Sequence, residues 1–330
     1  MAAVAASAEA AEAPPAPLPT QAKLWFLALR APFLIASLIP AALGILLAFE
    51  QAGAFDAALA ALTLAGVACF QLATNMLNDN FDYRSGNDLA VDHKNPFAGG
   101  GRVLTTGRVS LKAHLAVAVS FLLVGTALGF LIFFALGGLS TFAGSLLLLI
   151  GALGWGSTVF YVGPPLKFAH RGLGEVVVGL SFGPLVLIGA FLVQARAVSE
   201  GAVLLSLSMG LLVAAILWIN EFPDQKADLS VGKRTGMSRL GPVRSLRVYE
   251  GMLVGAFACV GTAAALGAVP VTTLLAFAAA PIAVKTVKVA HANYPDPHAL
   301  IPANAGTILL TALFGVLLTA GVALGVVLGI

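Results

Sequence analysis

The sequence predicts an all-α, polytopic membrane protein with about nine transmembrane helices. The chain has 330 residues, of which 59% are hydrophobic and only 10% are charged, whereas a soluble domain usually carries about 25% charged residues. Apolar runs near the roughly 20 residues that a helix needs to cross a bilayer recur along the chain. Its mean hydropathy is +0.97, and no basic tract points to nucleic acid as a partner. These observations place most of the chain in lipid.

Nine runs are long and apolar enough to be membrane helices. In order, they cover residues 23–50, 56–81, 111–135, 139–161, 173–195, 201–221, 246–267, 270–290 and 301–329. Residues 1–22 precede them, are rich in Ala and Pro, and are expected to form a disordered tail. No positively charged segment starts this tail, and Glu9 and Glu12 interrupt it, so a cleaved signal peptide is not expected.

Residues 23–330 are expected to form a single transmembrane domain. The second and sixth runs each lead into an acidic stretch, so the two stretches are four runs apart. We therefore expect two weakly repeated four-helix units followed by a ninth helix.

The cations indicate on which side of the membrane the connections lie. The chain start and the connections after even-numbered runs hold all of the 18 Lys and Arg except Arg196. Cytoplasmic loops collect Lys and Arg. We therefore expect a multi-pass protein of the cell (inner) membrane, with its N-terminus and both acidic stretches facing the cytoplasm.

Two acidic stretches interrupt the apolar chain, at residues 75–108 and 220–241. In the first, Asp79 and Asp82 are three residues apart, and side chains with this spacing share one face of a helix. The second stretch repeats the pattern, with Asn220 for Asn78, Glu221 for Asp79 and Asp224 for Asp82, followed by Asp228. Carboxylates at a membrane edge are costly and usually functional, so two such copies predict a site.

The residue types in these stretches suit a magnesium-bound diphosphate. Mg²⁺ prefers carboxylate oxygens and usually binds through one or two carboxylates together with substrate phosphates. The candidate metal ligands are Asp79, Asp82, Asp224 and Asp228, with Asn78 and Asn220 as neutral oxygens beside them. The cations expected to neutralise a departing diphosphate are Arg102, Lys167, Arg171, Lys233 and Arg234.

Other polar residues of these loops have two interpretations. Asp88 and Asp92 are either part of the site or an ordinary solvated surface. Residues 99–101, a glycine triplet, form either a flexible turn or a loop whose backbone approaches phosphate. The histidines are expected in loops or at a helix end, and no spacing among them resembles a zinc site. Four cations fit the positive-inside bias better than a site: Lys226, Arg239, Arg244 and Arg247.

The two acidic motifs resemble the signatures of the UbiA-type membrane prenyltransferases. The resemblance is carried by N-D-x-x-D at 78–82 and D-x-x-x-D at 224–228, together with Y-x-G-P-P-x-K at 161–167, R-G-L-G-E at 171–175 and G-K-R-T at 232–235. It covers residues 23–330. It implies nine transmembrane helices around a central cavity, Mg²⁺ as cofactor, a polyprenyl diphosphate as donor and an aromatic acceptor.

The resemblance also implies roles for individual residues. The residues that match the family's metal-diphosphate positions are Asn78, Asp79, Asp82, Asp224 and Asp228. Tyr161 and Lys167 match a Tyr/basic pair near the diphosphate and the reacting carbon. The chain departs from the longer form of the first motif, which has a third aspartate where this chain has Gly86 and places Asp88 two residues later.

Within the family, residues 78–86 and 95–103 most resemble the 1,4-dihydroxy-2-naphthoate polyprenyltransferases of menaquinone synthesis. This implies prenylation of 1,4-dihydroxy-2-naphthoate with loss of its carboxyl group, giving demethylmenaquinone. The acceptor carboxylate needs a cation, and Arg102 is the expected one, with Lys167 as the runner-up. Two alternatives remain: the same chemistry on 4-hydroxybenzoate or a tetrapyrrole, and a secondary transporter, which can also have repeats and broken helices.

Overall fold

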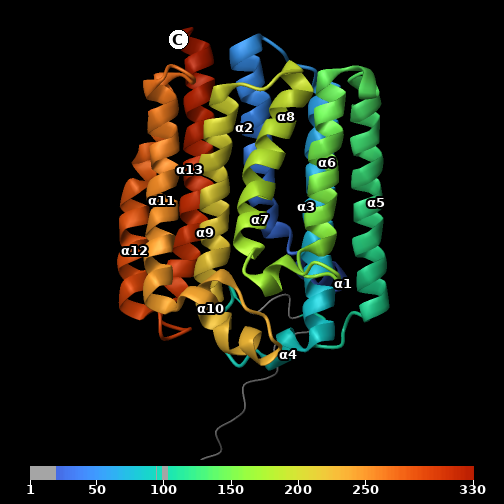
Figure 1. Ribbon diagram of the computed structural model, residues 1–330, viewed down its shortest axis with the longest axis vertical. Coiled ribbons are helices and arrows are strands. Elements are labelled where there is room, and N and C mark those ends of the chain that lie inside the picture. Colours follow the sequence, from blue (N-terminus) through green and yellow to red (C-terminus); the bar gives the residue numbers. More distant parts are fainter. Residues whose placement is uncertain (1–19, 94, 99–102) are drawn as a thin grey trace, which may run out of the picture.

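The computed structural model describes residues 20–93, 95–98 and 103–330 (Figure 1). This part of the chain contains helices and no strand, which confirms the all-α prediction. The α-helices are α1 (Gln21–Ala28), α2 (Ile35–Ala52), α3 (Ala57–Ser85), α4 (Asn87–Ala90), α5 (Leu111–Ala135), α6 (Phe142–Phe160), α7 (Gly174–Leu180), α8 (Val186–Ala195), α9 (Glu200–Ser230), α10 (Gly236–Leu240), α11 (Pro242–Ala265), α12 (Ala280–Asn293) and α13 (Ile301–Leu328). Short 3-10 or π segments are η1 (Ala31–Leu34), η2 (Gly138–Ser140), η3 (Phe168–Arg171), η4 (Ser181–Leu185) and η5 (Val271–Ala279).

Some predictions fall outside the described residues. These are the disordered tail up to residue 19, Lys94, the glycine triplet at 99–101 and Arg102.

Nine helical segments of the described chain are long and apolar enough to cross a membrane, as the sequence predicts. They cover Ala31–Ala52, Ala57–Ser85, Leu111–Ala135, Phe142–Phe160, Gly174–Ala195, Glu200–Ser230, Pro242–Ala265, Val271–Asn293 and Ile301–Leu328. Some include a short 3-10 or π segment, through which the span continues. The segments stand side by side in an upright bundle, with the C-terminus at the end opposite the short helices α4 and α10 (Figure 1).

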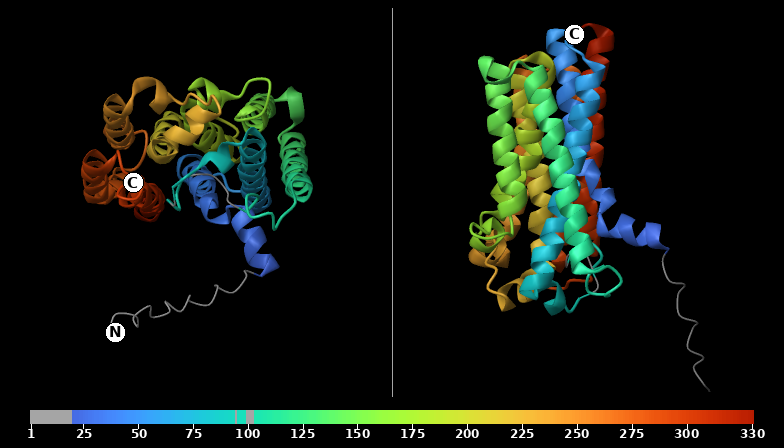
Figure 2. Two further views of the ribbon diagram at one scale, coloured as in Figure 1. Left: turned by 90° about the horizontal axis from the view of Figure 1, so that it is seen from below. Right: turned by 90° about the vertical axis from the view of Figure 1, so that its right-hand side faces the viewer.

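The first span begins later than the sequence predicts. The apolar run predicts one helix over residues 23–50, but the chain turns at Arg30, whose backbone is left-handed with φ 51°. Pro32 follows in the first turn of η1, and a proline disfavours α-helical geometry at the residue before it. A continuous helix is therefore broken, and α1 projects sideways from one end of the bundle (Figure 2). Arg30 stands at the corner between α1 and η1.

Helices α3 and α9 are the two longest, with 29 and 31 residues, and both run past the predicted ends of their spans. They end at Ser85 and Ser230. At 1.5 Å per residue, α3 reaches Asn78 after about 32 Å and α9 reaches Asn220 after about 30 Å, close to the roughly 30 Å of a bilayer's hydrocarbon core. Both acidic motifs therefore lie in the last turns of a helix, at the same end of the bundle (Figure 1).

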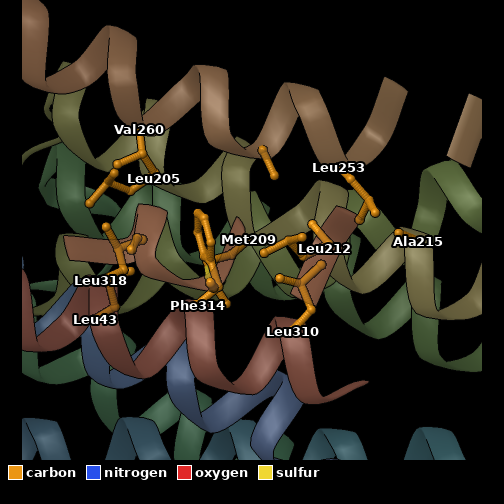
Figure 3. Packing of buried hydrophobic residues seen from close by; sticks show 14 of the residues in the cluster. Leu43, Leu205, Met209, Leu212, Ala215, Leu253, Val260, Leu310, Phe314 and Leu318 are labelled. Carbon is orange, nitrogen blue, oxygen red and sulfur yellow. The ribbon is translucent and has the colours of Figure 1, made fainter. Parts of the chain in front are cut away.

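The largest apolar core joins α2, α9, α11 and α13 (Figure 3). Phe314 of α13 is fully buried in it, with its ring centroid 5.0 Å from that of Phe257 in an edge-on arrangement. Met209 and Leu212 of α9 lie beside Phe314. Lipid is as apolar as these side chains, so helix association in a membrane depends on close packing. This packing fixes α9 and, with it, the acidic motif at its end.

Glycines bring α7 and the π segment η4 into close contact with α9. A Cβ on Gly210 would lie 2.4 Å from the carbonyl oxygen of Gly179, and a Cβ on Gly183 would lie 2.2 Å from that of Ser206. Both distances are shorter than a van der Waals contact, so a side chain fits at neither position without a backbone shift. Small residues let membrane helices approach closely, and here they fix α7 against α9.

We expect Gly210→Ala to destabilise the protein, because overpacking of a tight contact costs about 1–3 kcal/mol. Gly251→Ala is the matched control, since Gly251 also lies within a regular helix but an added Cβ there meets nothing within 4 Å. Thermal unfolding in detergent, followed by circular dichroism, should give a lower midpoint for Gly210→Ala and an equal or higher midpoint for Gly251→Ala. A wild-type midpoint for Gly210→Ala would contradict the close contact.

Candidate active site

A cavity of about 380 Å³ lies among the helices, bordered by residues of α2 to α9. Its polar end is lined by Asn220, Asp82, Asp88, Asp224, Asp228 and Lys233, and its apolar walls include Phe70, Ile132, Ile150 and Val193. Both Thr63 and Asp82 of α3 line it, so it extends about 28 Å along that helix. One end of this central cavity is therefore charged and at the membrane edge, and the rest is apolar.

The two acidic motifs meet at Lys233. Its Nζ lies 3.2 Å from Oδ1 of Asp228 in α9 and 3.9 Å from Oδ2 of Asp82 in α3. Burial alone would lower the pKa of Lys233, but the carboxylates of Asp82 and Asp228 raise this pKa well above its ordinary value. The amine is therefore charged, and it joins two motifs that are far apart in the sequence.

The backbone after α9 directs Lys233 toward the carboxylates. The helix ends at Ser230, and Gly232 then adopts a left-handed conformation with φ 76°, which glycine reaches without steric cost. The Lys233 amide donates a hydrogen bond of 2.9 Å to the carbonyl oxygen of Asp228. The chain thus folds back over the last turn of the helix, which gives the G-K-R-T pattern a local structural reason.

The other aspartate of each motif has a partner of its own. Asp79 Oδ1 lies 3.3 Å from Nη1 of Arg30, and Asp224 Oδ1 lies 2.9 Å from Nε2 of His93. Arg30 comes from the corner before η1 and His93 from the connection after α4. From the sequence, Arg30 is expected only among the cations of one membrane side and His93 only in a loop, because no spacing relates either residue to its partner.

Asp88 borders the cavity, which favours the first of its two interpretations. Gly86 ends α3 with φ 83°, and the chain then turns back so that Nδ2 of Asn87 donates to Oδ1 of Asp228 over 2.8 Å. Burial and the nearby carboxylates of α3 raise the pKa of Asp88 to about 8. Gly86, which stands where the longer motif has an aspartate, therefore makes the turn that brings Asp88 to the cavity.

Asp92 lies on the solvated surface. It forms an ion pair with Lys226, and the two side chains are 61% and 83% exposed. The pair lowers the pKa of Asp92. Surface pairs of this kind contribute little to stability. Asp92 therefore fits an ordinary solvated surface, whereas Asp88 borders the cavity.

The carboxylate cluster fits a cation that arrives with a phosphate ligand. Asp82 Oδ1 and Asp88 Oδ2 are buried and have no hydrogen-bond partner in the described part of the protein. Among the described residues, no three His, Cys, Asp or Glu side chains form a complete metal centre. Mg²⁺ usually binds through one or two carboxylates and completes its shell with water and substrate phosphates, which matches this donor set.

The remaining predicted site residues divide into two groups. Tyr161, directly after α6, lines the cavity, and burial raises the pKa of its hydroxyl, which stays protonated. Lys167, Arg171 and Arg234 are exposed, and none of these three side chains lines the cavity. Their roles, and that of Arg102, remain predictions.

A chain of buried side-chain amides holds Asn220. The sequence alone did not indicate these contacts. Nδ2 of Asn304, in α13, donates to Oδ1 of Asn220 over 2.7 Å, and Nδ2 of Asn95 donates to Oδ1 of Asn304 over 2.9 Å. Asn95 and Asn304 are fully buried. The connection after α4 is thereby tied to α9 and α13, which gives Asn95 a structural role within the segment 95–103.

Glu221 matches Asp79 in the sequence repeat, and neither of these two side chains lines the cavity. Its Oε2 accepts a hydrogen bond of 3.4 Å from the Met237 amide, and its carboxyl group hydrogen-bonds that of Glu175 in α7. Oε1 of Glu175 accepts a hydrogen bond of 2.5 Å from the Gly236 amide. The two carboxyl groups therefore attach the loop after Lys233 to α7 and α9.

Comparison with known proteins agrees with this architecture. Residues 37–304 match the UbiA prenyltransferase family. The chain is 29% identical over 301 residues to 1,4-dihydroxy-2-naphthoate octaprenyltransferase of Escherichia coli, covering 90% of this chain and 95% of that protein. It is 26% identical over 310 residues to 2-carboxy-1,4-naphthoquinone phytyltransferase of Synechocystis sp., covering 93% and 95%.

Solved structures show the same fold. A UbiA homolog from Aeropyrum pernix superposes with a TM-score of 0.61 at 22% identity, covering 86% of this chain and 96% of that one. A UbiA homolog from Archaeoglobus fulgidus, bound to GPP and Mg²⁺, superposes with a TM-score of 0.57 at 16% identity, covering 89% and 99%.

The chain belongs to the UbiA prenyltransferase family. It is a multi-pass membrane prenyltransferase, because the family match includes both acidic motifs and the nine apolar segments supply the membrane-spanning fold. This assignment removes the secondary transporter from the alternatives.

The ion-pair network predicts that Asp82 and Asp228 are essential. Asp82→Asn and Asp228→Asn keep the side-chain shape but remove the charge that faces Lys233, and we expect each to lower prenyl transfer about 100-fold or more. Asp92→Asn, at the exposed surface pair, is the control and should retain wild-type transfer. The measurement is transfer of a radiolabelled prenyl diphosphate by purified protein with Mg²⁺. Near wild-type turnover in both buried variants would show that the network is not the site.

Proposed function

We propose that this protein transfers a polyprenyl group from a polyprenyl diphosphate to 1,4-dihydroxy-2-naphthoate, with loss of the carboxyl group as CO₂, to give demethylmenaquinol, the reduced form of demethylmenaquinone. The observation that carries the proposal is the cavity, whose carboxylate-rich end and long apolar walls suit the two parts of a polyprenyl diphosphate. The acceptor is supported by the name of the Escherichia coli relative, a 1,4-dihydroxy-2-naphthoate octaprenyltransferase.

In this proposal, the carboxylates of the two motifs would hold divalent ions together with the diphosphate. The proposed ligands are Asp79 and Asp82 for one ion and Asp224 and Asp228 for another, with Asn78 and Asn220 beside them. Bound Mg²⁺ supplies positive charge that stabilises the departing diphosphate. Support comes from the unpartnered carboxylate oxygens at the polar end and from the Archaeoglobus fulgidus homolog, whose structure contains GPP and Mg²⁺.

Transfer breaks the bond between a diphosphate oxygen and C1 of the prenyl group, and the oxygen keeps the electron pair. Lys233, charged and adjacent to both motifs, stabilises the negative charge that develops on this oxygen. The ring carbon that bears the carboxylate attacks C1. The bond from that carbon to the carboxylate then breaks, its electron pair restores the aromatic ring, and CO₂ leaves. No ring proton is removed, so this step requires no base.

Other residues bind or orient the substrates. Tyr161 lines the cavity, and the face of its ring stabilises the allylic cation. Arg102 pairs with the carboxylate of the acceptor, with Lys167 as the alternative. Arg171 and Arg234 are both exposed, and the Arg234 amide donates to the His170 carbonyl oxygen over 3.3 Å, beside Arg171. They attract the diphosphate before it enters the cavity.

Purified protein with Mg²⁺ should convert 1,4-dihydroxy-2-naphthoate and a polyprenyl diphosphate to demethylmenaquinol. With carboxyl-labelled naphthoate, the label should appear as CO₂ in equal amount to the product. Arg102→Ala should lower kcat/KM for the naphthoate by roughly 10- to 100-fold, the worth of one charged hydrogen bond. Turnover of 4-hydroxybenzoate with none of the naphthoate would reject this acceptor, although the family assignment would stand.

Residues 23–330 are proposed to form one domain built from two repeated four-helix units and a ninth span, α13. The repeat is supported by α3 and α9, which carry their motifs after nearly equal lengths of apolar helix. The cation distribution supports a cytoplasmic site, in the cell (inner) membrane, because all Lys and Arg except Arg196 belong to one set of connections.

Reporter fusions test this orientation. Fusions between α4 and α5, after α6, after α9 and after α12 should be active with a reporter that works in the cytoplasm. Fusions after α2, α5 and α8 are the controls and should be inactive with it. If two of the four proposed cytoplasmic connections report the opposite side, the orientation is wrong.

A further inference from the structure

A polar stripe continues from the first acidic motif into the apolar part of the cavity. Gln71, Asn75, Asn78 and Asp82 follow one another at three- and four-residue spacing on α3, and all four line the cavity. Such spacing keeps side chains on one face of a helix. Gln71 lies about 12 Å along the helix from Asp79, toward the membrane interior. A polar side chain at this depth in a membrane protein calls for a functional explanation.

Two hydrogen bonds fix the orientation of Gln71. Its Nε2 donates to Oδ1 of Asn75 over 2.9 Å, and Nδ2 of Asn75 donates to the carbonyl oxygen of Leu29 over 3.1 Å. Asn75 thus connects Gln71 to the corner that precedes η1. Gln71 is only 6% exposed, and its Oε1 has no hydrogen-bond partner in the described chain. The cavity therefore contains a buried oxygen that can accept a hydrogen bond and whose orientation is set by the protein.

Only one of the two substrate classes can satisfy this oxygen. An ionised polyprenyl diphosphate consists of phosphate oxygens and hydrocarbon, so it has no hydrogen-bond donor. A hydroxylated aromatic acceptor has one on each ring hydroxyl. We propose that Oε1 of Gln71 accepts a hydrogen bond from a ring hydroxyl of the aromatic acceptor and so defines where the ring binds. The inference rests on the proposed function.

The same oxygen determines where the prenyl chain does not lie. Hydrocarbon packed over Gln71 would leave the amide oxygen desolvated and unpaired, which is unfavourable. Other parts of the wall have space, since an added Cβ at Gly129, Gly151 or Gly154 would meet no atom within 4 Å. The ring and the chain therefore approach the reacting carbon from separate parts of the cavity.

Ser181 also lines the cavity with an unpartnered buried atom, its Oγ. A hydroxyl group can both donate and accept, so Ser181 does not distinguish between the two substrates. An amide oxygen can only accept, and for this reason Gln71 carries the inference.

The test compares 1,4-dihydroxy-2-naphthoate with its two monomethyl ethers, each of which blocks one hydroxyl donor and leaves the ring electron-rich. For the wild-type protein, one ether should have a kcat/KM about tenfold below that of the parent, the worth of one hydrogen bond. Gln71→Met keeps the side-chain length but has no amide oxygen. It should raise the KM for the parent about tenfold, leave the KM for the prenyl diphosphate unchanged, and abolish the preference for the parent over that ether.

Gln194→Met is the matched control. Gln194 is similarly buried, at 7% exposure, but both of its amide atoms are hydrogen-bonded to the Asp56 backbone and it does not line the cavity. It should change thermal stability and leave the preference for the parent intact.

Two results would overturn the inference while the proposed function stands: equal use of the parent and both ethers by the wild-type protein, or a wild-type preference in Gln71→Met. The first needs no variant, so a folding defect does not block the test. If the wild-type protein does not use the naphthoate at all, the proposed function fails instead. The same comparison with 4-hydroxybenzoate and its methyl ether then decides the role of Gln71.

Discussion

The ammonium group of Lys233 lies between Asp82 of α3 and Asp228 of α9, and the polar end of the cavity depends on this interaction. Buried carboxylates on neighbouring helices repel each other strongly where the dielectric constant is low. Lys233 offsets this repulsion and holds the ends of the two helices together. Its side chain is still 15% exposed, so in the proposed mechanism it can exchange a carboxylate partner for a phosphate oxygen.

The position of this network in the membrane explains how one protein holds a charged group and a hydrocarbon chain. Helices α3 and α9 each cross about 30 Å of hydrocarbon before their motifs begin, so the charges stay near water. The cavity continues from Asp82 for about 28 Å along α3. Two contacts support the helices that border the cavity. The core around Phe314 holds α9, and the Gly179–Gly210 contact holds α7 against α9. Rigid helices thus keep the apolar part of the cavity open.

The spans and both motifs could be predicted from the sequence, because apolar length and the spacing of carboxylates on a helix are local properties. The interaction partners of the motif residues could not be predicted in this way. Arg30 and Asp79 are 49 residues apart, and only tertiary packing brings them together. The sequence also treats Lys233 and Arg234 alike, whereas the left-handed backbone of Gly232 turns the lysine to the carboxylates and leaves the arginine exposed. Residue type and spacing alone do not show which of the two side chains turns toward the carboxylates.

The corner at Arg30 links the two ends of the site. The guanidinium group of Arg30 lies 3.3 Å from Asp79, and the carbonyl oxygen of Leu29 accepts the hydrogen bond from Asn75. The left-handed backbone makes both contacts possible, because a continuous α-helix would use the Leu29 carbonyl within the helix. Asn75 in turn orients Gln71. A shift of this corner would therefore move a proposed metal ligand and the proposed acceptor contact together, so the break in the first predicted helix is part of the site and more than a tolerated kink in a membrane span.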